Sequence, residues 1–152
     1  GSTITINPSG STTAGSVYTS LRDALQVLNA CGGISQPIVI ELANGYTGSG
    51  EVFPITLRAL SGMSSTNTIT IRPASGATVN LSAAVAFNPI FSINGGTYWT
   101  IDGRAGGTGT TKSLTIENTS TALLSPGILL INGAQYNTIT YCNIKNASTR
   151  LY

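Results

Sequence analysis

The chain alternates apolar and polar residues over many short stretches. Beyond about residue 37, apolar positions come at every second residue in segments rich in Ile, Val and Thr, and Gly, Pro and Asn separate these segments. A period of two is typical of short β-strands with one buried face. The expected strands are 38–42, 52–57, 68–72, 79–81, 90–93, 99–101, 114–116, 128–131 and 138–144, after a leading strand at 4–6.

Short sequences also recur along the chain. The tetrapeptide at 67–70 returns unchanged at 137–140, and a related one lies between them at 99–102. Residues 93–101 match residues 131–139 at six of nine positions without a gap. Repeats at such intervals predict a solenoid, in which each turn buries its apolar side against the next. Grouping the strands in threes gives a right-handed parallel β-helix of three to four rungs, which begin near Ile38, Thr68, Trp99 and Thr138.

One segment near the N-terminus has the period of a helix instead. Ser20 and Asp23 form a capping pair, and the Gly32-Gly33 dipeptide ends the pattern. We expect a helix from Ser20 to Ala30 that covers the first rung as a lid. Its apolar face would carry Leu21, Ala24, Leu25 and Leu28.

The length of 152 residues fits a single domain, residues 1–152. Residues 1–2 are typical of a cloning scar, residues 3–36 form the leading strand and capping helix, and residues 37–152 form the rungs. The pattern stops without a closing cap, so a piece of a longer protein is expected. We therefore predict that the last rung, 138–152, either self-associates or is covered by its own terminal residues.

Charge is sparse, with seven basic and five acidic residues and a formal net charge of +2. No run of Lys or Arg exists, so neither nucleic acid nor an anionic membrane finds an electrostatic footprint. No apolar run is long enough to span a bilayer. A surface covered mostly by Ser, Thr and Asn suits an exported protein. Cys31 and Cys142 lack metal-ligand spacing, and we expect two free thiols that act as small buried hydrophobes.

Four stretches carry a family resemblance: 5–10, 18–25, 37–47 and 67–71. Together they resemble the start of the large exported right-handed β-helix proteins of the Bacteroidetes. The resemblance implies a pectin-lyase-like fold, secretion to the cell surface or medium, and a part in adhesion or polysaccharide handling. It implies no reaction, because many proteins of that superfamily are not enzymes and a fold does not assign chemistry.

The residues offer little catalytic chemistry. The chain has no histidine, which excludes a Ser-His-Asp triad and His-containing metal sites, and we expect no cofactor or metal. Arg72 and Arg104 share a phase and would stack on adjacent rungs near Asp102, which is one arrangement a polysaccharide lyase could use. The alternative is that Arg104 pairs with Asp102 while Arg72 is a solvated edge residue.

Strand alternation also predicts an outer face. If Ile69, Ile101 and Ile139 point into the coil, their neighbours point outward, whereas Trp99 points inward with Asn67 and Asn137. Stacked tyrosines, hydroxyls and guanidinium groups can bind a glycan, although Thr and Tyr are also ordinary strand residues, and Thr-x-Thr surfaces occur in ice-binding solenoids. Residues 104–112 would project as a loop. The candidate binding residues are Tyr98, Tyr136, Arg72, Asp102, Arg104, Thr100 and Thr138.

The sequence thus favours a non-catalytic extracellular β-helix module with a structural or adhesive role, which binds polysaccharide or a cell-surface glycan. The alternative is the N-terminal part of a polysaccharide lyase or glycoside hydrolase whose active residues lie in further rungs.

Overall fold

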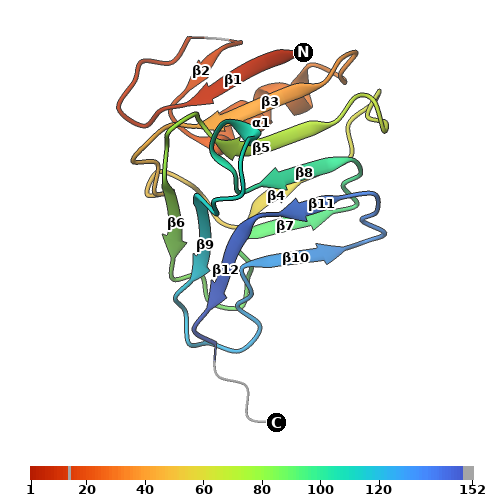
Figure 1. Cartoon of the computed structure of the whole chain (residues 1–152). Helices are drawn as coiled ribbons and strands as arrows, with labels where there is room; N and C mark the ends of the chain where they lie inside the picture. The colour runs from red at the N-terminus through yellow and green to blue at the C-terminus, as the bar shows by residue number, and fades with distance from the viewer. Residues whose placement is uncertain (14, 149–152) are drawn as a thin grey trace.

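The computed structural model describes residues 1–13 and 15–148 and shows a parallel β-solenoid of about four turns (Figure 1). The strands form three sheets, and every pairing between named strands is parallel. Sheet A has the order β2 (Val17–Tyr18), β1 (Ser2–Ile6), β3 (Ile38–Leu42), β5 (Ile69–Pro73), β8 (Trp99–Asp102) and β11 (Thr138–Thr140). Sheet B consists of β4 (Ile55–Leu57), β7 (Phe91–Asn94) and β10 (Ile128–Ile131), and sheet C of β6 (Val79–Ala83), β9 (Leu114–Asn118) and β12 (Cys142–Asn146).

The predicted rungs are confirmed. Each begins in sheet A, at β3, β5, β8 and β11, and the two complete turns pass through sheet C and then sheet B. In the first turn, residues 43–54 take the place of a sheet C strand. Ser2, grouped above with Gly1 as a scar, begins β1 and pairs with Ile38.

Inward-pointing side chains stack into a continuous core. Ile40, Ile71 and Ile101 occupy successive strands of sheet A and are completely buried. Trp99 is 2% exposed, as predicted, and its indole Nε1–H donates to the carbonyl of Arg58 at 2.8 Å. A long apolar column therefore runs down the coil, and burial of this column drives folding.

The register between β5 and β8 corrects one prediction. Thr70 pairs with Thr100 and Ile71 with Ile101, so the offset is 30 residues and not the 32 that aligns Thr68 with Thr100. Between β8 and β11 the predicted offset of 38 holds, and Thr100 pairs with Thr138. Thr and Ile alternate over 68–71, so a shift of two residues leaves every side chain on the same face. The predicted assignment of side chains to the inside and the outside of the coil therefore remains correct.

The last predicted strand, 138–144, is in fact two strands. Tyr141 has a φ of 52° and turns the chain from β11 in sheet A to β12 in sheet C. If the alternation of β11 continued past Thr140, Cys142 would lie on the outer face, but this corner turns it to the inside, where it packs against the core. A single strand direction therefore cannot be assumed across a solenoid corner.

The asparagines predicted to stack inside the coil make other contacts. The Asn137 amide donates to the Gly96 carbonyl at 2.8 Å, and its oxygen accepts from the Trp99 N–H at 3.0 Å. Asn67 donates to the Gly62 carbonyl. Each amide thus satisfies backbone groups at a turn, shortly before the chain enters a strand.

The predicted lid is confirmed as α1 (Leu21–Ala30). The Ser20 Oγ accepts from the Asp23 N–H at 3.1 Å, and Leu21, Ala24, Leu25 and Leu28 are buried. The sequence did not reveal a second cap. Glu51 accepts hydrogen bonds from the Leu21 N–H, the Arg22 N–H and the Tyr46 hydroxyl, and so places its charge at the positive end of the helix. Burial and this neighbouring carboxylate raise the pKa of Tyr46 well above its usual range.

The two cysteines are free, as predicted, but only one is shielded. Cys31 follows the last residue of α1 and is exposed, which contradicts the predicted buried role. Cys142 is half-buried, and desolvation, with a contribution from the charge of Asp102, raises the pKa of its thiol to about 11.

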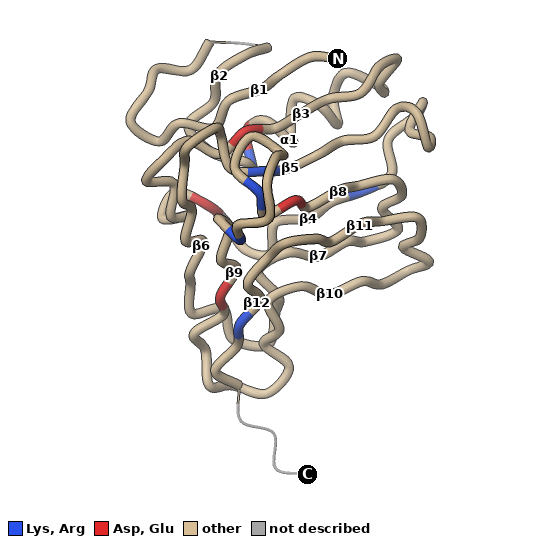
Figure 2. The backbone as a smooth tube through the Cα atoms, in the orientation of Figure 1, with Lys and Arg blue, Asp and Glu red and all other residues tan. Residues whose placement is uncertain are grey.

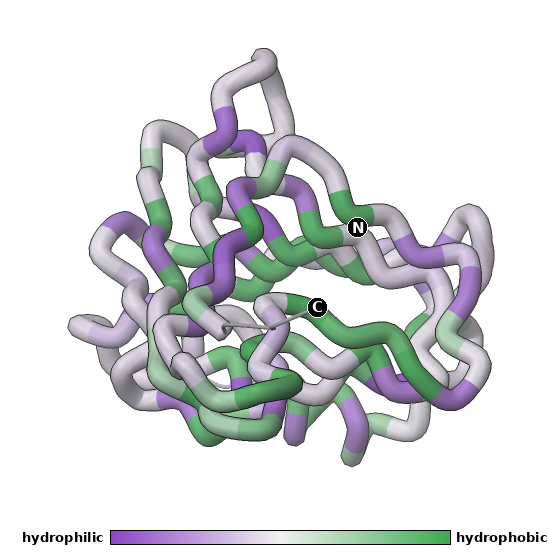
Figure 3. Tube along the Cα trace, turned by 90° about the horizontal axis from the view of Figure 1, so that it is seen from below, coloured by the Kyte–Doolittle hydropathy of each residue, from purple (hydrophilic) through white to green (hydrophobic). Residues whose placement is uncertain are grey.

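The C-terminal end of the coil is apolar and open among the described residues. Leu130 and Ile144 are 47% and 48% exposed, and Ile139 is half-buried. Figure 3 views this end and shows hydrophobic stretches on the strands nearest the viewer. The predicted covering by terminal residues concerns 149–152, which lie outside the described residues. Within the described chain, no helix is long and apolar enough to cross a membrane.

Candidate binding face on sheet A

Two tyrosines stack at the edge of sheet A, as predicted. The bridge between Thr97 and Gln135 brings two turns into register, and Tyr98 and Tyr136 follow it with φ values of 57° and 56°. Their ring centroids lie 5.1 Å apart and their planes differ by 11°. Tyr136 is 67% exposed. Bulky residues rarely adopt a positive φ, so this backbone geometry is a costly way to present two rings.

A row of threonines runs beside the tyrosines. Thr100 and Thr138 lie opposite each other, as predicted, and Thr70 extends the row in the place expected for Thr68. These residues alternate with the buried isoleucines and therefore point outward. Two residues further along the strands, Asp102 lies opposite Thr140.

Asp102 and Arg104 form a forked ion pair, which confirms the second of the two sequence interpretations for Arg104. Arg104 Nη2 lies 2.7 Å from Asp102 Oδ2, and Arg104 Nε lies 2.9 Å from Asp102 Oδ1. The guanidinium also lies over the ring of Tyr141, 4.7 Å from its centroid. Desolvation acts to raise the pKa of Asp102, but the hydrogen bonds and charge of Arg104, together with the charge of Arg72, outweigh it and hold this pKa below its usual range.

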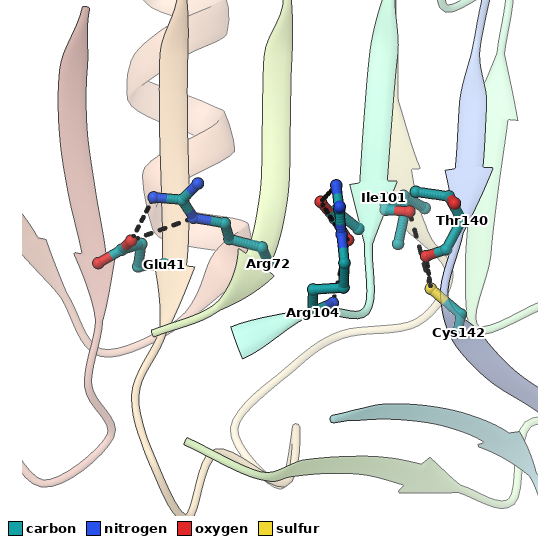
Figure 4. A network of polar contacts seen from close by, with 7 residues as sticks. Glu41, Arg72, Ile101, Arg104, Thr140 and Cys142 are labelled. Carbon is teal, nitrogen blue, oxygen red and sulfur yellow. Dashed lines mark hydrogen bonds and ion pairs between the residues drawn. The ribbon is translucent and has the colours of Figure 1, made fainter. Parts of the chain in front are cut away.

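Arg72 is not a solvated edge residue, and it does not stack on Arg104. Its Nε and Nη2 donate to Glu41 Oε1 at 3.1 and 2.8 Å. Figure 4 shows Glu41, Arg72, Arg104 and Cys142 in a row across neighbouring strands, with the Arg72 side chain directed toward Glu41 and away from Arg104. Two registers explain the arrangement: Arg72 pairs with Glu41 in the ladder of β3 and β5, and the corrected register of β5 and β8 leaves Arg104 beyond the end of β8.

Residues 104–112 were predicted to project as a loop, but the first half of this segment folds back against the coil. Residues Ala105–Gly107 form a short 3₁₀ turn, η1, that lies against β5. Gly107 has a φ of 73°, which favours glycine, and a Cβ at this position would lie 2.5 Å from Arg72 Nη1. The prediction of a projecting loop is therefore wrong for the first half of the segment, which lies against β5. Residues 108–112 are exposed.

Six of the seven predicted residues lie together on sheet A and one does not; Asp102 is only 5% exposed and belongs to the group through its ion pair with Arg104. We call the set Tyr98, Tyr136, Thr100, Thr138, Asp102 and Arg104 the tyrosine face. Arg72 is excluded because its guanidinium is paired with Glu41 and directed away from Arg104. Tyr141 joins the face under Arg104 and was missed, since strand alternation gives no direction for a residue at a corner.

All five carboxylates of the chain accept a hydrogen bond from the protein itself. Besides Asp102, Glu41 and Glu51, described above, Asp23 accepts from Arg22 Nε at 3.2 Å and Glu117 accepts from the Ser82 hydroxyl at 3.4 Å. Charged residues are sparse on the coil, and many gather near the ends of β5 and β8 (Figure 2). Among the described residues, no group of three or more His, Cys, Asp or Glu is placed to hold a metal ion.

The geometry above is the basis for assigning a function. Compared with protein-family models, curated proteins and solved structures, the chain gives no match.

Proposed function

We propose that this protein is a non-catalytic extracellular β-helix module that binds a glycan through the tyrosine face. One observation carries the proposal: the stacked pair of Tyr98 and Tyr136, of which the outer ring is 67% exposed. Stacking fixes the orientation of both rings, so little side-chain freedom is lost when a ligand binds. A flat apolar ring face fits the C–H face of a sugar ring.

Polar groups beside the rings can form directional hydrogen bonds with a ligand. The hydroxyls of Thr100 and Thr138 donate and accept hydrogen bonds, as sugar hydroxyls require. Arg104 is held on two sides, by Asp102 and by the ring of Tyr141, and the donors it does not use on Asp102 remain for a ligand oxygen. Because the pKa of Asp102 is lowered, the ion pair stays charged at neutral pH. The tyrosine face thus combines an apolar platform with a fixed cation.

The hydrogen bonds that the carboxylates accept within the protein support binding over catalysis. Glycoside hydrolysis needs two carboxyl groups that face one sugar bond, and elimination needs a base beside a group that neutralises the uronate. Each carboxylate here is engaged by a donor of the chain. The surface rich in Ser, Thr and Asn fits secretion or a place at the cell surface, and the stacked coil fits a structural or adhesive role.

The test is a glycan array followed by a pull-down on each polysaccharide that binds. We expect Tyr136→Ala to weaken retention about tenfold or more, the scale of a lost aromatic anchor. Phe87→Ala is the matched control, because Phe87 is also an exposed aromatic residue with a positive φ, 59°, but lies between β6 and β7. Equal retention by the Tyr136 variant and the parent, or equal losses in both variants, would contradict the proposal.

An absorbance assay for unsaturated uronate products, run on the same polysaccharides, separates binding from elimination. We expect no increase in absorbance. Product formation would instead favour the polysaccharide lyase interpretation and would place the reaction on residues that form the ion pairs described above.

A further inference from the structure

A concave site lies between α1 and β4, on another part of the molecule from the tyrosine face. It is a groove of about 370 Å³, formed by one face of the helix and by the strand with its flanking residues. Arg22 and Arg58 both line it, one from the helix and one from the residue after β4. The volume lies in the range of sites that hold small molecules. No residue of the tyrosine face lines this groove.

All charged residues that line the groove are basic. None of the residues that line it is acidic. Arg22 uses its Nε on Asp23, and this pair is largely exposed, whereas Arg58 has no ion-pair partner among the described residues. The nearby Glu51 directs its carboxylate to the N-terminus of α1. An anion in the groove would therefore meet two guanidinium groups, of which only Arg22 already contacts a carboxylate, that of Asp23.

The floor of the groove is apolar. Leu25 and Ile55 form part of the hydrophobic core and are 6% and 2% exposed, and Val52 stands beside them with 59% exposure. An exposed valine next to a shallow apolar floor leaves hydrophobic surface that a ligand could cover. The site thus suits a molecule with an apolar body and an anionic end.

A backbone donor adds to this site. In the described part of the chain, β4 is the outermost strand of sheet B and pairs only with β7. The Ile55 N–H donates to the Ile90 carbonyl, and residues of a parallel ladder bond to their two sides alternately. The Thr56 N–H therefore points away from β7, toward the open edge of the strand, and Thr56 lines the groove. This donor can bind a carboxylate oxygen.

The Arg58 end of the groove is held in place from the core. The indole N–H of Trp99, the only tryptophan in the chain, donates to the Arg58 carbonyl at 2.8 Å. This bond fixes the backbone that carries the guanidinium. It also gives a unique signal, because a single indole N–H resonance reports on the Arg58 carbonyl.

We propose that the groove between α1 and β4 binds a small carboxylate with an apolar body, whose carboxylate lies between Arg22 and Arg58. The ligand is a free aromatic or aliphatic acid in preference to a sugar acid, because the floor is apolar. This site is independent of the tyrosine face, so failure of one proposal leaves the other intact.

The experiment is an NMR titration of the isotope-labelled protein with three probes: 2-naphthoate, its neutral amide 2-naphthamide, and glucuronate. We expect 2-naphthoate to shift the amide signals of Gln26 and Thr56 and the indole signal of Trp99. The amide should bind about tenfold more weakly, the scale of a lost charge-assisted hydrogen bond. Equal binding of acid and amide, or no binding of the acid, would overturn the proposal. Binding of glucuronate as tight as that of 2-naphthoate would overturn the assignment of an apolar body.

Variants locate the site. Arg58→Gln should weaken 2-naphthoate about tenfold, for the same reason. Lys145→Gln is the matched control, since Lys145 is an exposed cation on β12 that does not line the groove. Unchanged affinity in the Arg58 variant, or an equal loss in both variants, would show that the acid binds elsewhere, for example at the apolar last rung.

Discussion

At the N-terminal end of the coil, α1 buries four apolar side chains over the first turns. At the other end, nothing among the described residues stacks on the last turn, and six large hydrophobic side chains of residues 129–144 are more than a third exposed. Both ends are made of strands with the same apolar alternation, so alternation alone does not produce burial.

Residues paired across the last two turns show the same difference one by one. Ile116 on β9 pairs with Ile144 on β12, and their exposures are 0% and 48%. Ile93 on β7 pairs with Leu130 on β10, and the values are 0% and 47%. The side chains and strand geometry are similar within each pair. In a solenoid, a residue is buried by the turn above it as well as by its own strand.

The largest expected effect is at the covered end. Leu25→Asp should lower the free energy of unfolding by about 3 kcal/mol or more, because it loses an apolar side chain from the core and buries an unpaired charge. Urea denaturation measures the change. Val27→Asp, on the same helix but 41% exposed, is the control and should change little. Equal stability of the Leu25 variant and the parent would mean that α1 is not a lid.

The paired isoleucines give a direct comparison. Ile116→Ala should cost about 2–5 kcal/mol in the free energy of unfolding, the usual range for a buried isoleucine. Ile144→Ala should cost roughly 1 kcal/mol or less, since half of the side chain already meets solvent. Both values come from the same denaturation curves. Similar costs at the two positions would show that something covers the last turn in solution.

A second copy of the chain could cover the last turn. An unpaired strand edge beside exposed apolar side chains favours association between chains, so the protein should self-associate through its last rung. We expect sedimentation at several concentrations to show oligomers, and Ile144→Lys and Ile139→Lys to shift the mass toward the monomer. A parent that stays monomeric at high concentration, with costs at Ile116 and Ile144 as different as expected, would leave the open edge bare and contradict self-association.

Much of the fold could be predicted from the sequence because a solenoid repeats its own pattern. The rungs, the lid helix and the stack of Tyr98 on Tyr136 follow from spacing and alternation. The register of β5 did not, because Thr-Ile alternation looks the same after a shift of two residues. That shift moved Arg104 past the position beside Arg72, and the pairing of β5 with β3 placed Arg72 beside Glu41.

The missed contacts lie at corners and loops, where no period applies. Tyr141 turns the chain at a positive φ, and this turn sent Cys142 to the inside. Gly107 folds the 104–112 segment onto Arg72. Glu51 reaches α1 from a loop about 30 residues along the chain. Contacts of this kind depend on the path of the chain in space, which strand alternation does not describe.

The smallest expected effect compares the two thiols, one at each end. In the native protein at pH 8, iodoacetamide should modify Cys31 about tenfold faster than Cys142 or more, because the thiolate is the reactive form and the pKa of Cys142 is raised to about 11. Half-burial of Cys142 acts in the same direction, because it limits the access of the reagent to the thiol. Peptide mapping by mass spectrometry measures both rates, and the denatured protein, in which the difference should disappear, is the control.

Equal rates in the native state would mean that the last rung opens often enough to expose Cys142, since local opening removes both the burial and the nearby charge of Asp102. The uncovered end would then differ from the lid end in its motion as well as in its exposure.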